Sequence, residues 1–123
     1  MAKYMFLALT NPVEGKENEF NEWYDQHHVP DVINVPGFVS GQRFKLSDAQ
    51  FGGEASKQYK YLALYEIETD DLAATIKELK ARGGTPDIVA SDAIDGRKVA
   101  TYMFTQIREK VMAKDVKRPR RAA

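Results

Sequence analysis

The sequence predicts an α+β fold in which a four-stranded antiparallel sheet carries two helices on one face. Three observations lead to this prediction. The chain of 123 residues is long enough for one domain with one core. Four short apolar runs are separated by turn residues or by helical patterns. The order of these segments is β-α-β-β-α-β, which is the ferredoxin-like arrangement.

Residues 3–10 are predicted to form the first strand, with both faces covered, because their apolar residues do not alternate with polar ones. A helix is predicted over residues 16–28, where a helical stripe is formed by Phe20, Trp23, Tyr24 and His27. Pro30 is expected to stop or kink this helix, because the residue before a proline avoids the helical conformation.

A second strand is predicted over residues 38–46. One face would carry Phe38, Ser40, Gln42 and Phe44, and the other Val39, Gly41, Arg43 and Lys45. Gly41 lies inside it and indicates a close backbone approach or a bulge. Residues 47–58 contain Gly52-Gly53 and are predicted to form a loop.

Residues 59–67 are predicted to form the third strand, again with apolar side chains on both faces. Residues 69–71 (Thr-Asp-Asp) offer a cap for a second helix, which is predicted to run to Arg82 and to end at Gly83-Gly84. The fourth strand is predicted over residues 99–107.

Two helices can cover only one face of such a sheet, although three of the four strands are apolar on both faces. An exposed apolar sheet face would favour aggregation. A second copy of the chain, packed sheet against sheet, would cover it, and symmetric homodimers are the commonest oligomers. We therefore expect a homodimer.

Composition narrows the classes of function. Eighteen basic residues balance eighteen acidic ones, so we expect neither nucleic acid nor a membrane as a partner. The absence of cysteine excludes disulfides and thiolate chemistry. No apolar run is long enough to span a membrane and no signal peptide is evident, so a cytoplasmic protein is expected. Residues 1–112 are predicted to form the domain, and residues 113–123 a basic, disordered tail.

Residues 21–31 (NEWYDQHHVPD) hold both histidines of the chain, its only tryptophan and two aspartates. Histidine is the side chain that most easily exchanges protons near neutral pH. Neighbouring residues of a helix diverge by ~100°, so only one of His27 and His28 is expected to face a pocket.

Residues 22–31 (EWYDQHHVPD), followed by residues 35–38 (VPGF), resemble the EthD-like branch of the dimeric α+β-barrel superfamily. His28 matches the family histidine, while His27 stands where the family often has an acidic residue. The resemblance implies that two sheets form a barrel and that the substrate pocket lies between the sheet and the helices. Relatives include cofactor-independent polyketide cyclases, decarboxylases, isomerases and monooxygenases.

By this resemblance, His28 is expected to face the pocket as general acid or base. Asp31 could orient its imidazole and raise its basicity. Tyr24 lies one helical turn away and could donate to a developing oxyanion. The alternative is structural, because a histidine at a helix C-terminus can simply cap free carbonyls.

The binding residues are expected to form an apolar slot for a planar or aromatic ligand. The aromatic candidates are Trp23, Phe6, Phe44 and Tyr65. Arg43 could bind a carboxylate or phenolate, or else form a salt bridge. His27 is kept as a further binding candidate, although a surface position is the alternative for it.

These residues together predict a cofactor-free lyase, isomerase or cyclase that acts on a small hydrophobic, aromatic or polyketide-like catabolic intermediate. A cofactor-free monooxygenase is the alternative enzyme, and a small-ligand-binding or stress-related dimer is the non-enzymatic alternative. No metal is expected, because adjacent histidines on a helix point apart. Neither glycine pair has the spacing of a phosphate-binding loop.

Overall fold

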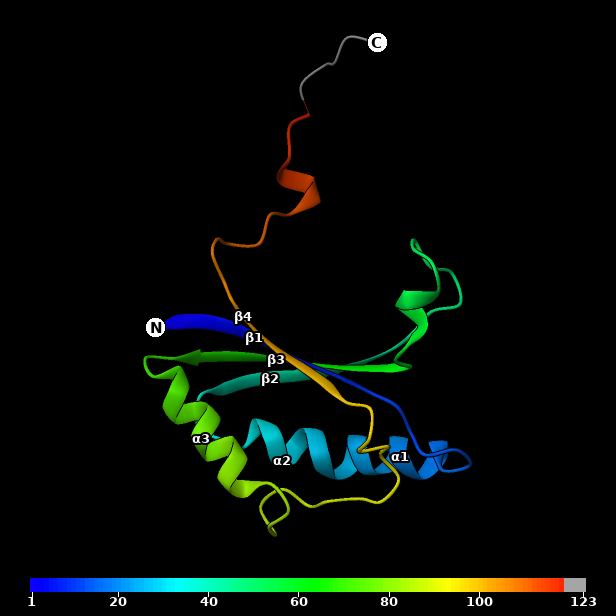
Figure 1. Ribbon diagram of the computed structural model, residues 1–123. Helices are drawn as coiled ribbons and strands as arrows, with labels where there is room; N and C mark the ends of the chain where they lie inside the picture. Colours follow the sequence, from blue (N-terminus) through cyan, green and yellow to red (C-terminus); the bar gives the residue numbers. More distant parts are fainter. Residues whose placement is uncertain (119–123) are drawn as a thin grey trace.

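The computed structural model describes residues 1–118 and confirms the predicted fold. One antiparallel sheet has the strand order β2-β3-β1-β4. Its strands are β1 (Ala2–Thr10), β2 (Phe38–Lys45), β3 (Tyr61–Thr69) and β4 (Ala100–Thr105). The labelled helices all lie on one side of this sheet (Figure 1).

The first helical segment runs further than the sequence predicts. It comprises α1 (Glu17–Trp23), the π-helical turn η1 (Tyr24–His28) and α2 (Val29–Ile33). The second long helix is α3 (Leu72–Arg82), capped by the Asp71 carboxylate, which accepts from the Ala74 N–H. Two short 3₁₀ turns complete the set, η2 (Glu54–Lys57) and η3 (Ala113–Asp115).

The prediction that Pro30 could stop the helix at this point is wrong. Val29 keeps helical backbone angles, with φ −61° and ψ −50°, and its N–H donates to the Tyr24 carbonyl five residues back. Pro30 lies at the start of α2. A proline is tolerated in the first turn of a helix, where its missing N–H costs no bond. The wide π turn before it therefore lets the chain continue as a helix.

The helix-facing side of the sheet holds the core. Along β3 the side chains of Tyr61, Ala63, Tyr65 and Ile67 alternate inward and are buried. Phe6 of β1 stands opposite Tyr65 and packs against the same core. Strand pairing therefore places the middle of β1 and β3 directly beneath the first helical segment.

Gly41 allows a helix to approach the sheet closely, as its position in the strand predicted. A Cβ on Gly41 would lie 3.0 Å from methyl groups of Val29 and Ile33 and 3.0 Å from the ring of Tyr65. The irregularity of β2 is elsewhere, between Phe38 and Ser40. That shift puts Phe38 on the helix face, although simple alternation predicted it on the other face with Ser40.

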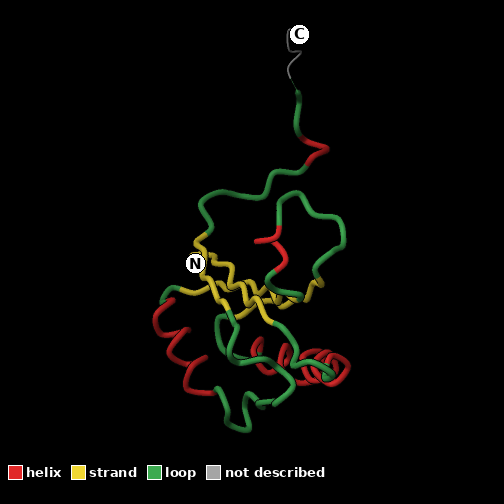
Figure 2. The backbone as a smooth tube through the Cα atoms, turned by 45° about the vertical axis from the view of Figure 1, so that its right-hand side comes forward, coloured by secondary structure: helices red, strands yellow, loops and turns green. Residues whose placement is uncertain are grey.

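The opposite face of the sheet is apolar, and within residues 1–118 no helix covers it. Its aliphatic and aromatic members are Met5, Leu7, Leu9, Phe44, Leu62, Leu64, Tyr102 and Phe104. The loop that contains η2 and the segment after β4 both rise on this side (Figures 1 and 2). The predicted homodimer contact stays a prediction for this face.

None of the described helices has the length and hydrophobicity that a membrane crossing requires. The predicted basic tail begins at η3, and its last residues, 119–123, lie outside the described part of the chain.

Candidate functional site

The π turn brings three aromatic rings of one helix together. The imidazole of His28 stacks on the indole of Trp23 with 4.6 Å between ring centroids, and the ring of Tyr24 meets it edge-on at 4.9 Å. A regular helix would pair Trp23 with His27 instead. The extra residue in the π turn moves His28 into that place, and His27 is exposed. The expected divergence of the two histidines is therefore present, with His28 on the inner side.

His28 is half-buried and partly unpaired. Among the described residues its Nδ1 atom is buried and has no hydrogen-bond partner. Burial lowers the pKa of His28 from 6.5 to about 4, and the nearby Asp31 carboxylate opposes this only in part. The imidazole is therefore neutral at neutral pH, with one ring nitrogen facing the protein interior.

Asp31 has a different partner from the one the sequence suggested. Its Oδ2 atom accepts a hydrogen bond of 3.1 Å from the N–H of Val89. No hydrogen bond joins Asp31 to His28 in the described structure. The expected orientation of the imidazole by Asp31 is thus replaced by a longer-range electrostatic effect.

Two tyrosines face the same interior from different elements. Tyr24, on η1, and Tyr65, on β3, are 2% and 1% exposed. Burial raises the pKa of both phenols, so both stay protonated and can donate. The Tyr65 hydroxyl has no hydrogen-bond partner among the described residues. The ring of Phe6 stacks on Tyr65 at 5.9 Å and supplies an apolar wall.

Arg43 lies on the helix face of β2, and two of its donors are already engaged. It donates from Nη1 to Asp25 and from Nη2 to Asn21, at 2.8 Å in each case. Its guanidinium also lies over the ring of Tyr24, 4.6 Å from the centroid. The geometry matches the salt-bridge alternative and adds Asn21, which sequence reasoning missed.

Two of the expected binding residues, Phe44 and His27, lie apart from the other candidates. Phe44 stands opposite Leu62 on the helix-free face of the sheet, and 41% of it is exposed. Because Phe6 and Tyr65 point the other way, the expectation that Phe44 shares their slot needs correction. His27, exposed on the helix surface, lies outside the group as well.

The segment between α3 and β4 contributes contacts that the sequence did not reveal. The indole Nε1–H of Trp23 donates to the Val89 carbonyl at 2.9 Å. Ile88 and Ala93 are 5% and 0% exposed and belong to the core. No spacing rule predicts such contacts, because they join residues 66 positions apart through backbone atoms.

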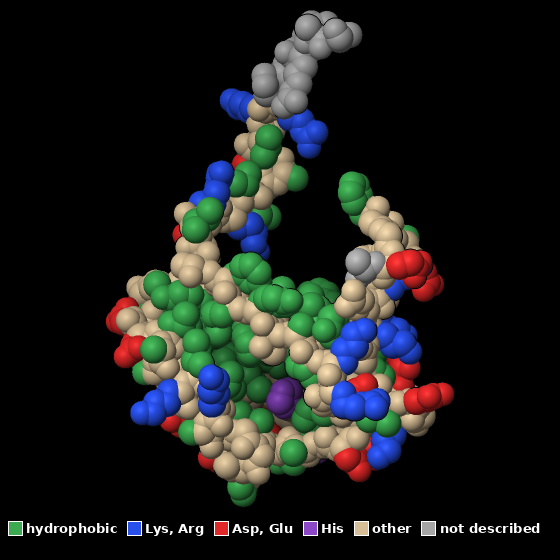
Figure 3. Space-filling model, viewed as in Figure 1, with side chains coloured by type: hydrophobic (Ala, Val, Ile, Leu, Met, Phe, Trp, Pro, Cys, Tyr) green, Lys and Arg blue, Asp and Glu red, His purple; other side chains and the backbone are tan. Residues whose placement is uncertain are grey.

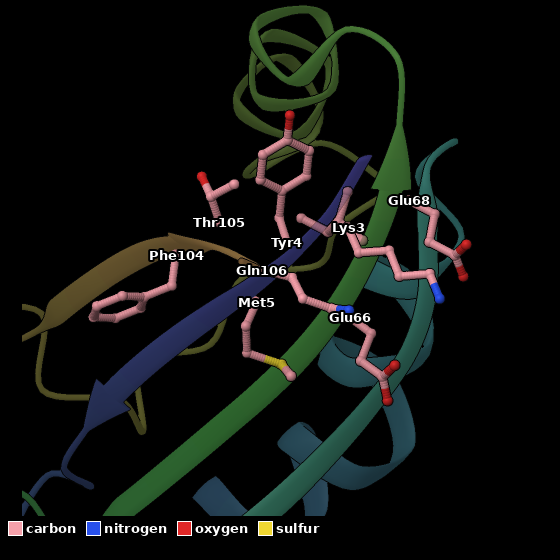
Figure 4. A pocket seen from close by; sticks show the side chains of 9 residues that line it. Lys3, Tyr4, Met5, Glu66, Glu68, Phe104, Thr105 and Gln106 are labelled. Carbon is pink, nitrogen blue, oxygen red and sulfur yellow. The ribbon is translucent and has the colours of Figure 1, made fainter. Parts of the chain in front are cut away.

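None of five surface cavities over the described residues is lined by His28 or Tyr24. One of them, of about 250 Å³, lies over β1, β3 and β4 and is lined by Met5, Glu66 and Phe104 among others (Figure 4). In the space-filling view a histidine borders a broad area of hydrophobic side chains (Figure 3). No cluster of three metal-ligating side chains occurs among the residues that are described.

The chain matches no protein-family model and none of the curated protein sequences compared with it. It is similar to solved structures. An ethyl tert-butyl ether D (EthD) family protein from Bacillus halodurans c-125 shares 18% identity and a TM-score of 0.60, covering 87% of this chain and 100% of its own. A suspected monooxygenase from Shewanella loihica PV-4 shares 13% identity and a TM-score of 0.56, covering 89% and 99%.

A variant of MhuD, described with two manganese protoporphyrin IX groups bound per active site, shares 16% identity and a TM-score of 0.58, covering 89% of this chain and 99% of its own. At such identities the likeness establishes the fold. The chain therefore has the fold of the dimeric α+β-barrel proteins, which its histidine segment also resembles.

Proposed function

We propose that this chain is a cofactor-free enzyme of the lyase, isomerase or cyclase type, with His28 as its acid–base group. The observation that supports this most is the buried, unpartnered Nδ1 of His28. Buried polar atoms are normally hydrogen-bonded, and an exception calls for an explanation. A ligand that hydrogen-bonds to this nitrogen would supply one.

The proposed chemistry is proton transfer next to a carbonyl. Neutral His28 takes a proton from carbon, and a protonated phenol stabilises the negative charge that develops on the carbonyl oxygen. The imidazolium then returns the proton to a different atom of the substrate, or to a leaving hydroxyl. Positioned proton transfer of this kind accelerates a reaction by ~10²–10⁴-fold.

The environment of His28 also limits the substrate. Since burial lowers its pKa to about 4, the ring is a weak base and suits a carbon acid that is already activated. The surrounding rings of Trp23, Phe6 and Tyr24 favour an apolar, planar molecule. A small aromatic or polyketide-like compound with neighbouring carbonyl or phenol groups meets both requirements.

The proposal includes a homodimer that packs through the helix-free sheet face. Tyr102 and Phe104 on this face are 51% and 54% exposed. Leu7 and Leu64 stand side by side on the same face. Covering them by a second copy removes apolar surface from water, which is the main driving force of association.

Two other functions have some support. The similarity to a suspected monooxygenase favours a reaction of the substrate with oxygen in the same site. The closed interior favours a module that only holds a hydrophobic ligand.

The experiment is a thermal-shift screen of aromatic ketones and phenols, followed by mass spectrometry of incubated hits. We expect a hit to stabilise wild type and, less strongly, His28→Ala, while turnover is lost only in the variant. An isomerised or cyclised product keeps the substrate mass or loses water, whereas a monooxygenase product gains one oxygen atom. Turnover that survives in His28→Ala would remove this imidazole from the mechanism.

A further inference from the structure

The segment between α3 and β4 passes beside the first helical segment before it enters the sheet (Figure 1). We call residues 86–95 the strap. Two of its residues, Ile88 and Ala93, are buried in the core that Trp23 and Tyr24 share. The strap is thus a loop segment that forms one side of the interior beside His28.

The ends of the strap are fixed by backbone hydrogen bonds. At one end the Gly84 N–H donates to the Ile88 carbonyl at 3.1 Å. At the other, the N–H of Val13 donates to the Ala93 carbonyl at 2.7 Å and the N–H of Asp95 donates to the Asn11 carbonyl at 2.9 Å. These bonds involve no side chain of the candidate site.

Val89 holds the middle of the strap through two backbone groups. Its N–H donates to Asp31 at 3.1 Å, and its carbonyl accepts from the indole of Trp23 at 2.9 Å. Both partners belong to the helical segment that carries His28, and Trp23 stacks directly on the imidazole. The side chain of Val89 is itself 42% exposed, so it contributes little to holding the strap.

Because the Nδ1 of His28 is buried, part of its surroundings has to move before a ligand can reach it. The sheet is joined by continuous ladders of hydrogen bonds, and the helix by its own backbone bonds. The centre of the strap is held by the two hydrogen bonds of Val89 and by an exposed salt bridge of 3.2 Å between Lys16 and Asp92. Segments with few bonds open at the lowest free energy.

We propose that Asp31 and Trp23 are positioning residues that hold the strap closed over His28, and that release of Val89 opens the site to its ligand. This inference rests on the proposed function, in which His28 is the group that the ligand must reach. It assigns Asp31 a role in access, in place of the orienting role that the sequence suggested.

The test uses the ligand-free, full-length chain. Trp23 is the only tryptophan, so intrinsic fluorescence reports on the strap directly. In Asp31→Ala we expect red-shifted emission, several-fold stronger quenching by acrylamide, and at least tenfold faster amide exchange in residues 86–92. Exchange in β3 should stay as in wild type, because the sheet does not depend on this bond.

Two further variants distinguish the effect of the hydrogen bond between Val89 and Asp31 from the effect of the negative charge of Asp31. Asp31→Asn keeps an oxygen that can accept from Val89, so it should resemble wild type in emission and exchange. Val89→Pro removes the N–H and leaves Asp31 intact, so it should reproduce the faster exchange of Asp31→Ala at the neighbouring residues.

The proposal is overturned if Asp31→Ala and Val89→Pro both leave exchange in residues 86–92 unchanged. It is equally overturned if exchange in β3 rises to the same degree, since Asp31 would then stabilise the whole fold. Both readouts are taken without ligand, so they can fail while His28 still acts on a substrate. Conversely, His28 can prove inactive while the strap still opens.

Discussion

At the scale of single residues, the interior beneath the first helix contains polar atoms that the fold itself does not use. The Tyr65 hydroxyl and the His28 Nδ1 are both buried without a partner among residues 1–118. An unpaired buried donor or acceptor costs about 1–3 kcal/mol. Such a cost is expected where a protein keeps polar groups ready for a ligand, since function and stability then compete.

The phenol of Tyr65 gives the first prediction. Tyr65→Phe should leave the free energy of unfolding unchanged or raise it by about 1 kcal/mol, because no hydrogen bond is lost. Tyr61→Phe is the matched control: its hydroxyl donates to Glu17 and accepts from Asn21, so this variant should be destabilised. Urea unfolding measures both. A marked destabilisation by Tyr65→Phe would mean that its hydroxyl has a structural partner.

At the scale of elements, the π turn decides the composition of the site. Because η1 contains one residue more per turn than an α-helix, Trp23, Tyr24 and His28 converge on one face. The helix also lies unusually close to β2, since Val29 and Ile33 rest on Gly41. A strand glycine and a helix irregularity together bring the imidazole to the sheet.

The close approach at Gly41 can be tested by adding a single methyl group. Gly41→Ala should destabilise the protein by about 1–3 kcal/mol, because its Cβ would meet three neighbouring atoms at 3.0 Å. Gly52→Ala is the control, with no atom within 4 Å of its Cβ. The difference in midpoint between the two urea curves is the measurement, and equal midpoints would argue against close packing of α2 on β2.

The sequence predicts the elements better than it predicts their contacts. Periodicity and caps place all four strands and α3 within two residues of their observed ends. They do not predict that the helix continues past Pro30, because a π turn does not alter the spacing of apolar residues in the sequence. They also miss the strap, whose bonds to Asp31 and Trp23 use the backbone of Val89 and so depend on no particular side chain.

At the scale of the whole molecule, the two faces of the sheet have different roles. One face carries the helices and the candidate site, and the other is apolar and flanked by the η2 loop and the segment after β4 (Figure 2). Such a face, bordered on two sides, is suited to receive an equal face of a second copy. The proposed dimer and the proposed site therefore use separate surfaces of each subunit.

The proposed dimer can be tested by placing a charged side chain on the helix-free face of the sheet. Leu64→Glu puts a carboxylate in the middle of the helix-free face, opposite Leu7, and burying it in an interface would be costly. We expect light scattering to give twice the chain mass of 13.9 kDa for wild type and once that mass for the variant. Ala73→Glu on α3, exposed on the helix side, should stay dimeric. A monomeric wild type would exclude the dimer.

The charge state of His28 links the site to the stability of the molecule. Its pKa is about 4 in the folded chain, against 6.5 when unfolded, so protonation favours the unfolded state. The stability present above pH 6.5 should fall by up to about 3 kcal/mol as the pH drops to about 4. Urea unfolding of wild type and of His28→Gln measures this effect. Acid should destabilise both proteins through their other groups, and wild type should lose the additional stability that comes from His28.

The most direct measurement is the titration of the imidazole itself, followed by the NMR signals of its ring protons. The His27→Gln variant, altered at an exposed position, identifies the signals that belong to His28. An enclosed ring predicts a midpoint at about pH 4 in the ligand-free protein. A midpoint at the ordinary value of 6.5 would show a ring open to water, and would contradict the enclosed interior in which the account places the imidazole.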